Sequence, residues 1–346
     1  INIEQKENQN ILNDNLFLLH VLTLIYMPIL LQLNSASNWG STGKITEQIG
    51  QKVMEAGWES YVIYGRKEYS QPSRNNVILI GCRGAVYEHY FEHVVFDREG
   101  LASRLGTKEV IKQIESVRPD VIQLHVIHDH WLNYQILFSY LAKTRIPVVW
   151  TQHDQWAITG HCYYDYDCVL WKTECHNCPQ RNKFSFDRSR RNYNLKKSLF
   201  TSLKSLTIVP VSNWLADYVH QSFFKDCSIN VIHNGIDLTA FKPHNTDVRI
   251  KYGLSSKKIV LGVANGWSKR KGLSDFFSLA KLLPSEQFEI VLVGKVDRID
   301  VVNKVSEFKI SFIDRTQSSL ELAQLYSSAS VFVNPTYQDN YPTTNL

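Results

Sequence analysis

The stretch "ILLQLNSASNWGSTGK" (29–44) contains the unit from which the rest of the fold can be read. Residues 29–33 are apolar except for Gln32, and a polar loop with Gly40 and Gly43 follows before a helical pattern begins. A strand with so little polar alternation is typical of a parallel sheet that is buried on both faces. The stretch therefore predicts a strand, a glycine-bearing loop and a helix.

The same βα pattern recurs along the chain. Apolar runs predict further strands at 61–65, 76–80, 120–125, 147–151, 206–212, 230–235, 258–264, 288–294, 308–313 and 330–334. Helical patterns lie between them at 43–56, 107–117, 131–143, 191–204, 271–283 and 318–329. Thr107 and Ser318 are the expected N-caps, and Gly57 is the expected C-cap of the first helix. Repeated βα units predict an α/β fold of parallel sheets with helices on both faces.

Length and composition set the outer limits. A chain of 346 residues is too long for one ordinary core and predicts two domains. The polar segment "HNGIDLTAFKPHN" (233–245) interrupts the βα rhythm, and we expect the hinge there. Hydrophobic residues make up 44% and charged residues 21%, as in ordinary globular proteins, and a net charge of +5 identifies no partner.

The first residues do not fit the βα pattern. Residues 1–15 are polar, and the apolar run 16–33 that follows has the length of a bilayer span. His20, Thr23 and Pro28 interrupt this run, and no signal-peptide cleavage pattern follows. We interpret 1–26 as an N-terminal extension, non-native or disordered, while a membrane segment remains the alternative.

Residues that follow strands are the candidate site residues, because ligands of open parallel sheets bind beyond the carboxyl ends of the strands. Gly40 and Gly43 let the backbone approach a ligand at a helix N-terminus. His125, His128, Asp129 and His130 follow the strand at 120–125, where histidines form a polar pocket wall or hold a metal.

A second set of such residues follows later strands. His153 and Asp154 follow the strand at 147–151. The cations Lys269, Arg270 and Lys271 stand at the start of a helix, where the helix dipole disfavours them unless an anion binds there. Solvated surface charge is the alternative. Two such loops in two α/β domains suggest a nucleotide-containing ligand.

The segment "HCYYDYDCVLWKTECHNCP" (161–179) is a cysteine-rich insert. It contains Cys162, Cys168, Cys175 and Cys178, and a Cys-x-x-Cys pair is a common half of a tetrahedral zinc site. Structural zinc, free buried thiols and disulfides are all open interpretations of this cluster. It lacks the alternation of basic and aromatic residues that a nucleic-acid-binding finger has.

These motifs, taken in order, resemble the retaining glycosyltransferases of family 4. The resemblance rests on the glycine loop at 34–44, "HNGIDLTAFKP" (233–243), "SKRKG" (268–272) and the final loop "NPTYQDNYPTTNL" (334–346), and it covers 27–346. A segment similar to "WTQHDQWAITGHC" (150–162) is found in the bacterial surface-polysaccharide members. The resemblance implies a GT-B fold with two facing Rossmann-like domains. These would be an acceptor-side domain at 27–240 with the insert 161–179, and a nucleotide-sugar-binding domain at 241–346.

The resemblance also implies roles for individual residues. Gly40 and Gly43 would lie at the donor diphosphate, His153 would contact the transferred sugar, Lys271 would neutralise the leaving group, and Asp339 would bind sugar hydroxyls. Lys269, Arg270 and Asn340 would complete the donor site, and His125, His128 and Asp154 would lie on the acceptor side. Many members have Arg at the position of Gly266. The family's second acidic residue would fall beyond Leu346, so we expect the second domain to be incomplete, and the resemblance does not predict turnover by this chain alone.

The expected function is transfer of a sugar from a UDP- or GDP-sugar to a glycan or lipid-linked acceptor in capsule or lipopolysaccharide synthesis. No catalytic metal and no nucleic acid are expected. The expected location is the cytoplasm, with peripheral association at the inner face of the plasma membrane. Two alternatives are a sugar-nucleotide 2-epimerase of the same fold and a zinc-stabilised binding module without enzymatic activity.

Overall fold

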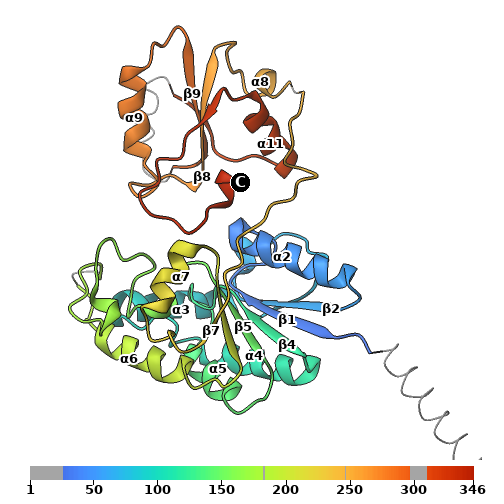
Figure 1. Cartoon of the computed structure of the whole chain (residues 1–346), viewed down its shortest axis with the longest axis vertical. Coiled ribbons are helices and arrows are strands. Elements are labelled where there is room, and N and C mark those ends of the chain that lie inside the picture. The colour runs from blue at the N-terminus through green and yellow to red at the C-terminus, as the bar shows by residue number, and fades with distance from the viewer. Residues whose placement is uncertain (1–25, 182–183, 246, 297–309) are drawn as a thin grey trace, which may run out of the picture. The chain divides into compact units, whose positions relative to one another are not determined.

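The structure is a computed structural model that describes residues 26–181, 184–245, 247–296 and 310–346 (Figure 1). The expected N-terminal extension and the first part of the apolar run 16–33 lie outside these residues. By its internal contacts the chain divides into two compact units. The first unit comprises the described residues up to 150 together with 202–207, and the second comprises 151–201 and 208–346. The domain boundary expected after residue 240 differs from this division and stays a prediction.

A seven-stranded sheet contains the N-terminal strands in the order β3-β2-β1-β4-β5-β6-β7. Its strands are β1 (Ile29–Asn34), β2 (Glu59–Tyr64), β3 (Asn76–Leu79), β4 (Val121–Leu124), β5 (Val148–Gln152), β6 (Leu206–Pro210) and β7 (Ser228–Ile229). β1 pairs in parallel with β2 and β4, β2 with β3, and β4 with β5, which confirms the predicted parallel sheet. From β1 the sheet extends to one side through β2 and β3, and from β4 onward it extends to the other side. In folds with this strand order, ligands bind beyond the carboxyl ends of the strands where the direction changes, which here is between β1 and β4.

Helices connect these strands (Figure 1). They are α2 (Gly40–Glu55), α3 (Arg83–Phe96), α4 (Arg104–Val117), α5 (Tyr134–Leu141), α6 (Ser189–Phe200) and α7 (Asn213–His220). Four of them confirm predicted helices, and the sequence patterns missed α3 and α7. Gly57, with φ of +85°, follows the C-cap of α2 in the left-handed conformation that ends many helices.

A four-stranded sheet contains the C-terminal strands in the order β10-β9-β8-β11. Its elements are β8 (Lys258–Gly266), β9 (Phe288–Lys295), β10 (Ser311–Ile313), β11 (Val331–Phe332), α8 (Val248–Lys251), α9 (Leu273–Leu282) and α11 (Ser319–Ser328). Every recorded pairing is parallel. Val260 and Leu292 pack with Phe276 of α9, whereas Leu261 and Val291 belong to a second core cluster. Successive residues thus serve opposite faces, which explains the unbroken apolar runs in the sequence.

Two local predictions are wrong. No strand is formed at 230–235, because β7 ends at Ile229, although the N–H groups of Asn230 and Ile232 still donate to carbonyls of β6. Thr107 is not an N-cap, because α4 begins three residues earlier and the Thr107 hydroxyl donates to the carbonyl of Ser103. Ser318 is confirmed as the N-cap of α11, since its side chain accepts the N–H of Glu321.

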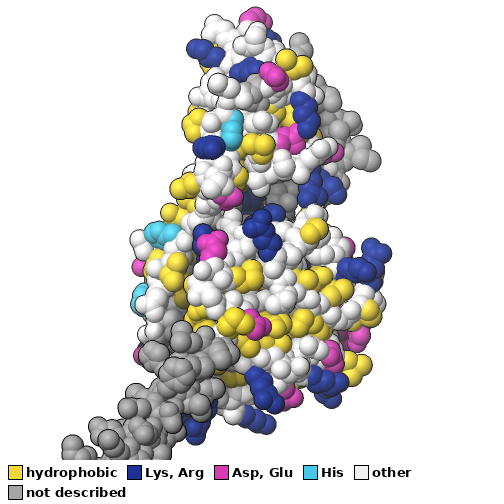
Figure 2. All heavy atoms as spheres, turned by 90° about the vertical axis from the view of Figure 1, so that its right-hand side faces the viewer, with side chains coloured by type: hydrophobic (Ala, Val, Ile, Leu, Met, Phe, Trp, Pro, Cys, Tyr) yellow, Lys and Arg dark blue, Asp and Glu magenta, His cyan; other side chains and the backbone are white. Residues whose placement is uncertain are grey.

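Within the described ranges, no helix combines the length and the apolar character needed to cross a bilayer. On the face shown in Figure 2, Lys and Arg side chains are spread over the surface, with acidic side chains between them. The mild positive charge is therefore not concentrated on that face.

A buried carboxylate fixes the loop between β2 and β3 to α2. Glu47 of α2 is only 5% exposed and accepts hydrogen bonds from Ser73, the backbone N–H of Arg74, Gln51 and Asn75. Burial alone would raise the pKa of Glu47, but these hydrogen bonds outweigh it and hold the pKa below its ordinary value of 4.5. The ionised form is thus the one that the folded protein stabilises.

We expect Glu47→Gln to lower the free energy of unfolding by about 1.5–3 kcal/mol at pH 7, because hydrogen bonds to a charged group are lost. A carboxyl group whose pKa is lower in the folded protein than in the unfolded chain stabilises the fold at pH values above its unfolded-state pKa. This stabilisation is lost as the pH falls below about 4.5. Urea unfolding at several pH values should therefore show the difference between wild type and variant shrinking in acid. Glu55→Gln, on the exposed face of the same helix, is the control and should change stability by less than about 0.5 kcal/mol. A difference that stays constant with pH would contradict this role.

Candidate functional site

The loop after β8 lies against the final loop of the chain. Gly272 is the N-cap of α9 and has φ of +72°. A Cβ atom at this position would lie 2.4 Å from the carbonyl oxygen of Pro335, which is closer than real Cβ atoms come to an oxygen. Glycine at this position thus permits both the left-handed backbone and the close approach of the two loops.

Cations of the first loop meet the carboxylate of the final loop. Lys271 Nζ donates to Asp339 Oδ2, and Arg270 Nη1 lies 3.9 Å from the same oxygen. Arg270 also donates to the carbonyl of Gln338 at 2.7 Å and accepts the N–H of Tyr337 at its own carbonyl. All three charged side chains are less than a quarter exposed, so water screens their interactions only partly. We call Arg270, Lys271 and Asp339 the charged cluster.

The charged cluster also answers why cations are tolerated at the start of α9. Asp339 supplies a negative charge beside Lys271, and Asp275 lies in the first turn of the helix. These carboxylates offset the unfavourable interaction of the cations with the helix dipole. The predicted alternative of purely solvated surface charge is wrong for Lys271, which is 19% exposed. Lys269 is exposed, as that alternative expects.

The final loop also contacts the segment that follows β5. Asn340, 5% exposed, donates from Nδ2 to the carbonyl of His153 at 2.9 Å. Gln338 donates to Asp165 Oδ1 at 2.7 Å, and the guanidinium of Arg270 lies 4.3 Å from the ring centre of Tyr164. The second unit therefore brings together His153, the charged cluster and Asn340, which are far apart in the sequence.

Burial affects the Tyr164 hydroxyl in this neighbourhood. Removal from water is the largest cause of a raised pKa at Tyr164, and the nearby Arg270 charge opposes it. The phenol is thus neutral at physiological pH and can donate a hydrogen bond. Tyr164, Asp165 and Gln338 were not among the predicted site residues.

The segment after His153 is held by side chains that the sequence did not single out. Asp154 Oδ1 accepts the N–H of Trp156, so this carboxylate closes a local turn. Lys196 of α6 is 1% exposed, donates to the carbonyls of Trp156 and Thr159, and lies 3.5 Å from the ring centre of Trp156. Lys196 is a positioning residue for the turn that follows His153.

The glycine loop belongs to the first unit. Gly40 begins α2 with φ of +64° and has open space where a Cβ would lie. At Gly43 a Cβ would lie 3.3 Å from the carbonyl oxygen of Ala36, so this glycine allows the helix to pack closely on its own loop. Local packing therefore accounts for the glycine at position 43 but not for the glycine at position 40.

The histidines after β4 have different surroundings. His125 is 3% exposed, and its Nε2 lies 3.2 Å from Gln32 Oε1 in the core. His128 is half-buried. His130 points towards His93 of α3. The acceptor-side roles of His125, His128 and Asp154 stay predictions.

The four cysteines of the insert carry free thiols, so the disulfide interpretation is wrong for this structure. A hydrogen bond from Cys162 lowers the pKa of Cys178 to about 6, and the same bond, with burial, raises that of Cys162. Burial raises the pKa of Cys175 to about 11, and its sulfur accepts the N–H of Gly160 at 3.3 Å.

Among the residues that the structure describes, the group of potential ligand atoms within 4.8 Å of one another is His93, Glu99 and His130 rather than these cysteines.

Comparisons with known proteins agree with this architecture. The family model described as Glycosyltransferase Family 4 matches residues 43–240. The putative colanic acid biosynthesis glycosyl transferase WcaC of Escherichia coli (strain K12) is 26% identical over 225 residues, which are 60% of this chain and 55% of that protein. The chain thus spans about half the length of this curated relative.

Two solved structures are similar in fold. Sucrose-phosphate synthase from Thermosynechococcus elongatus has a TM-score of 0.62 at 16% identity, covering 92% of this chain and 77% of that one. HepE of Anabaena in complex with UDP and glucose has a TM-score of 0.55 at 15% identity, covering 92% and 77%. At this identity the likeness shows the fold, which is GT-B.

Proposed function

The chain belongs to glycosyltransferase family 4, whose model matches more than half of it, and from that premise we propose that it transfers a sugar from a nucleotide-sugar donor to a glycan or lipid-linked acceptor. The polysaccharide context is supported by the similarity to WcaC, which is described as a colanic acid biosynthesis enzyme. We propose a surface polysaccharide as the product and retention of configuration at the transferred sugar.

The observation that carries this proposal is the charged cluster. Two cations stand at the start of α9, and the carboxylate of Asp339 lies beside them. A sugar diphosphate requires both features, since its phosphates attract fixed cations and its sugar hydroxyls donate to a carboxylate. The cluster thus offers complementary groups for both halves of a nucleotide-sugar donor.

The chemistry that these residues supply is stabilisation of the leaving group. Negative charge builds up on the diphosphate as the glycosidic bond breaks, and Lys271 and Arg270 are held in place by hydrogen bonds before the reaction begins. Cations that are already oriented stabilise such charge without reorganisation. Lys269 and Asn340 would complete the donor site, and Gly40 and Gly43 would bring backbone N–H groups to the phosphates.

Acceptor activation completes the proposed mechanism. His153 would contact the transferred sugar, while His125, His128 and Asp154 would lie on the acceptor side. A phosphate oxygen of the donor would take the acceptor's proton on the same face from which the leaving group departs. We further propose a cytoplasmic location with association at the inner face of the plasma membrane, where lipid-linked acceptors are available.

A structural zinc in the insert is a separate proposal. Cys162, Cys168, Cys175 and Cys178 are the ligands that the Cys-x-x-Cys spacing suggests. The hydrogen bond between Cys162 and Cys178 supports two of these ligands as neighbours. Zinc would have to draw the other thiols closer, because among the described residues the insert offers no three ligand atoms within 4.8 Å of one another. Zinc would then order the segment that contacts the final loop.

Titration with a panel of UDP- and GDP-sugars tests the function. We expect one donor to bind, and mass spectrometry with a lipid-linked acceptor to show the acceptor gaining one sugar. Inversion at the second carbon of the sugar without transfer would instead indicate an epimerase. If no donor binds, the chain is a binding module and the proposal is wrong.

A further inference from the structure

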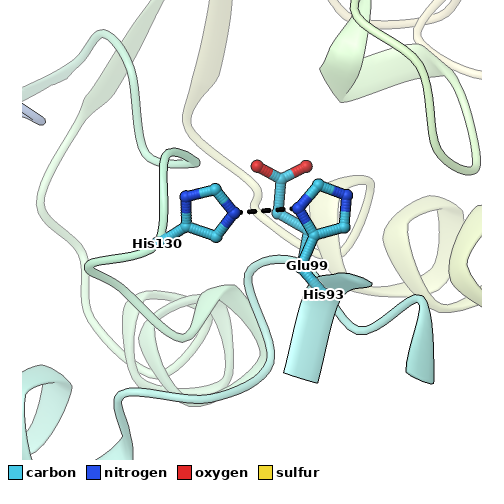
Figure 3. A group of neighbouring side chains, drawn as sticks. All are labelled: His93, Glu99 and His130. Carbon is cyan, nitrogen blue, oxygen red and sulfur yellow. Dashed lines mark hydrogen bonds between the residues drawn. The ribbon is translucent and has the colours of Figure 1, made fainter. Parts of the chain in front are cut away.

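Three potential metal ligands converge in the first unit, outside the residues assigned above to the donor and acceptor. They are His93 in the last turn of α3, Glu99 between α3 and α4, and His130 in the loop after β4 (Figure 3). Their ligand atoms all lie within 4.8 Å of one another. Two imidazoles and a carboxylate from three separate segments form a set of ligands that a divalent metal can use.

The two imidazole rings face each other directly. His93 Nδ1 lies 2.8 Å from His130 Nε2, and the ring centroids are 5.1 Å apart with the ring planes at 26° to each other, so the two rings meet edge to edge through these nitrogens. The Glu99 carboxylate lies beside the pair (Figure 3), and Glu99 is 6% exposed. A carboxylate with so little contact with water is stable only with positive charge or hydrogen-bond donors around it.

The loop that presents His130 has an unusual backbone. Asp129 and His130 have φ of +74° and +64°, a left-handed conformation that residues other than glycine adopt only at an energetic cost. Contacts from other segments hold this conformation. Arg66 donates to the Asp129 carbonyl and carboxylate at 3.2 and 2.9 Å, and the N–H of Asp129 donates to Glu99 at 3.4 Å.

The surroundings also fix the direction of the His130 ring. Tyr90 and His89 approach it edge-on, with ring centroids 5.4 and 5.6 Å away. Asp129 Oδ1 lies 3.8 Å from His130 Nδ1, on the side of the ring away from His93. At this distance the carboxylate acts on the imidazole through its negative charge rather than through a hydrogen bond. A negative charge behind a metal-ligating histidine raises the basicity of the ring.

We propose that His93 Nδ1, His130 Nε2 and one Glu99 oxygen bind a single Zn²⁺ ion. Mixed nitrogen and oxygen ligands suit zinc, whereas magnesium and calcium require sets dominated by oxygen. Zinc–nitrogen bonds of 2.0–2.1 Å in a tetrahedron place two nitrogens about 3.3 Å apart, so the rings need to separate by only about half an ångström. The ion ties the end of α3 to the loop after β4.

The competing interpretation is a hydrogen bond between two neutral imidazoles beside a buried carboxylate. That arrangement would hold the same segments together without a metal. The two differ in metal stoichiometry, and the cysteines of the insert must be excluded as an alternative source of bound zinc.

The test is equilibrium zinc binding to the metal-free chain, measured by competition with a chromophoric chelator. We expect His93→Gln, Glu99→Gln and His130→Asn each to lose one zinc equivalent. Asparagine is chosen at position 130 because it tolerates the left-handed backbone better than most residues. Circular dichroism verifies the fold, and Glu99→Gln, which keeps the shape of the side chain, guards against variants that fail to fold.

Two further variants sharpen the result. Asp129→Asn should weaken zinc binding about 10- to 100-fold, but one zinc equivalent should still bind at saturation, as expected for a residue that lies beside a ligating histidine and does not bind the metal itself. His220→Gln, in the exposed last turn of α7, should change nothing.

Cobalt substitution separates the proposed site from the cysteines. Cobalt bound by His93, Glu99 and His130 should show visible bands without the thiolate charge-transfer absorption that cysteine ligands produce. Cys162→Ser should leave this equivalent in place. The proposal is overturned if the three ligand variants keep the full zinc content, or if all bound zinc disappears with Cys162.

Discussion

Lys271→Ala is expected to raise the dissociation constant of the nucleotide-sugar donor about 10- to 100-fold, the effect of losing a charge-assisted hydrogen bond. Turnover should fall further, by about 100- to 1,000-fold, because the charge on the leaving diphosphate develops in the transition state. Lys271 is held against Asp339 at the start of α9, so its charge is in place before the donor arrives. Calorimetric donor titration and single-turnover kinetics measure the two effects.

The control must separate donor binding from stability. Lys281→Ala removes a lysine charge from the last turn of α9 instead, and it should leave the donor dissociation constant and the turnover rate unchanged. Lys271→Ala also leaves the Asp339 carboxylate without its closest cation, which costs stability. Adding Asp339→Asn should recover that stability but not donor binding. If Lys271→Ala binds the donor with wild-type affinity, the charged cluster is not part of the donor site.

Gly272→Ala is expected to destabilise the second unit by about 3–5 kcal/mol, in the upper range for single substitutions. The left-handed backbone accounts for about 1–2 kcal/mol of this. The rest comes from the Cβ atom, which would lie 2.4 Å from the carbonyl oxygen of Pro335 and force the two loops apart. Asp339 lies four residues after Pro335, so donor binding should weaken as well.

Gly253→Ala isolates the steric part of this effect. Gly253 has φ of +62°, close to that of Gly272, but nothing lies within 4 Å of its added Cβ. Its cost should be limited to the backbone term of about 1–2 kcal/mol. Thermal and urea unfolding of the two variants provide the comparison. Equal losses would mean that the contact with Pro335 relaxes freely.

The sheets were predictable because their strands are buried on both faces. Runs such as 258–264 and 288–294 alternate between two core clusters, so both sets of positions must be apolar. A continuous apolar run of this length has few other structures available to it. The C-terminal sheet and its order of βα units could therefore be inferred without coordinates.

The missed elements lack this strong pattern. In α3, Tyr87, Tyr90 and Phe91 are more than half exposed, so apolar residues do not form one buried stripe. At α7 the strand prediction ran through Ser212, whose side chain is the N-cap of the helix and accepts the N–H of Leu215. Local preference did not decide these boundaries; packing and a single cap did.

The site was predictable only where one segment carries the signal. The run from Lys269 to Lys271 and the loop with Asp339 stood out by charge and position, and the structure brings Lys271 and Asp339 together. Lys196 appeared as an ordinary helix lysine, because only the fold reveals its burial beneath Trp156. Ligand groups assembled from distant segments leave no spacing in the sequence to recognise.

The position of β1 within its sheet has a consequence for synthesis of the protein. β1 leaves the ribosome well before β4, its partner on one edge, which follows about 90 residues later. At about 5–20 residues per second, one edge of this apolar strand waits several seconds for its partner. Parallel pairing of this kind also folds slowly, since a long loop must close first. We expect the nascent chain to depend on chaperones that shield this edge until β4 arrives.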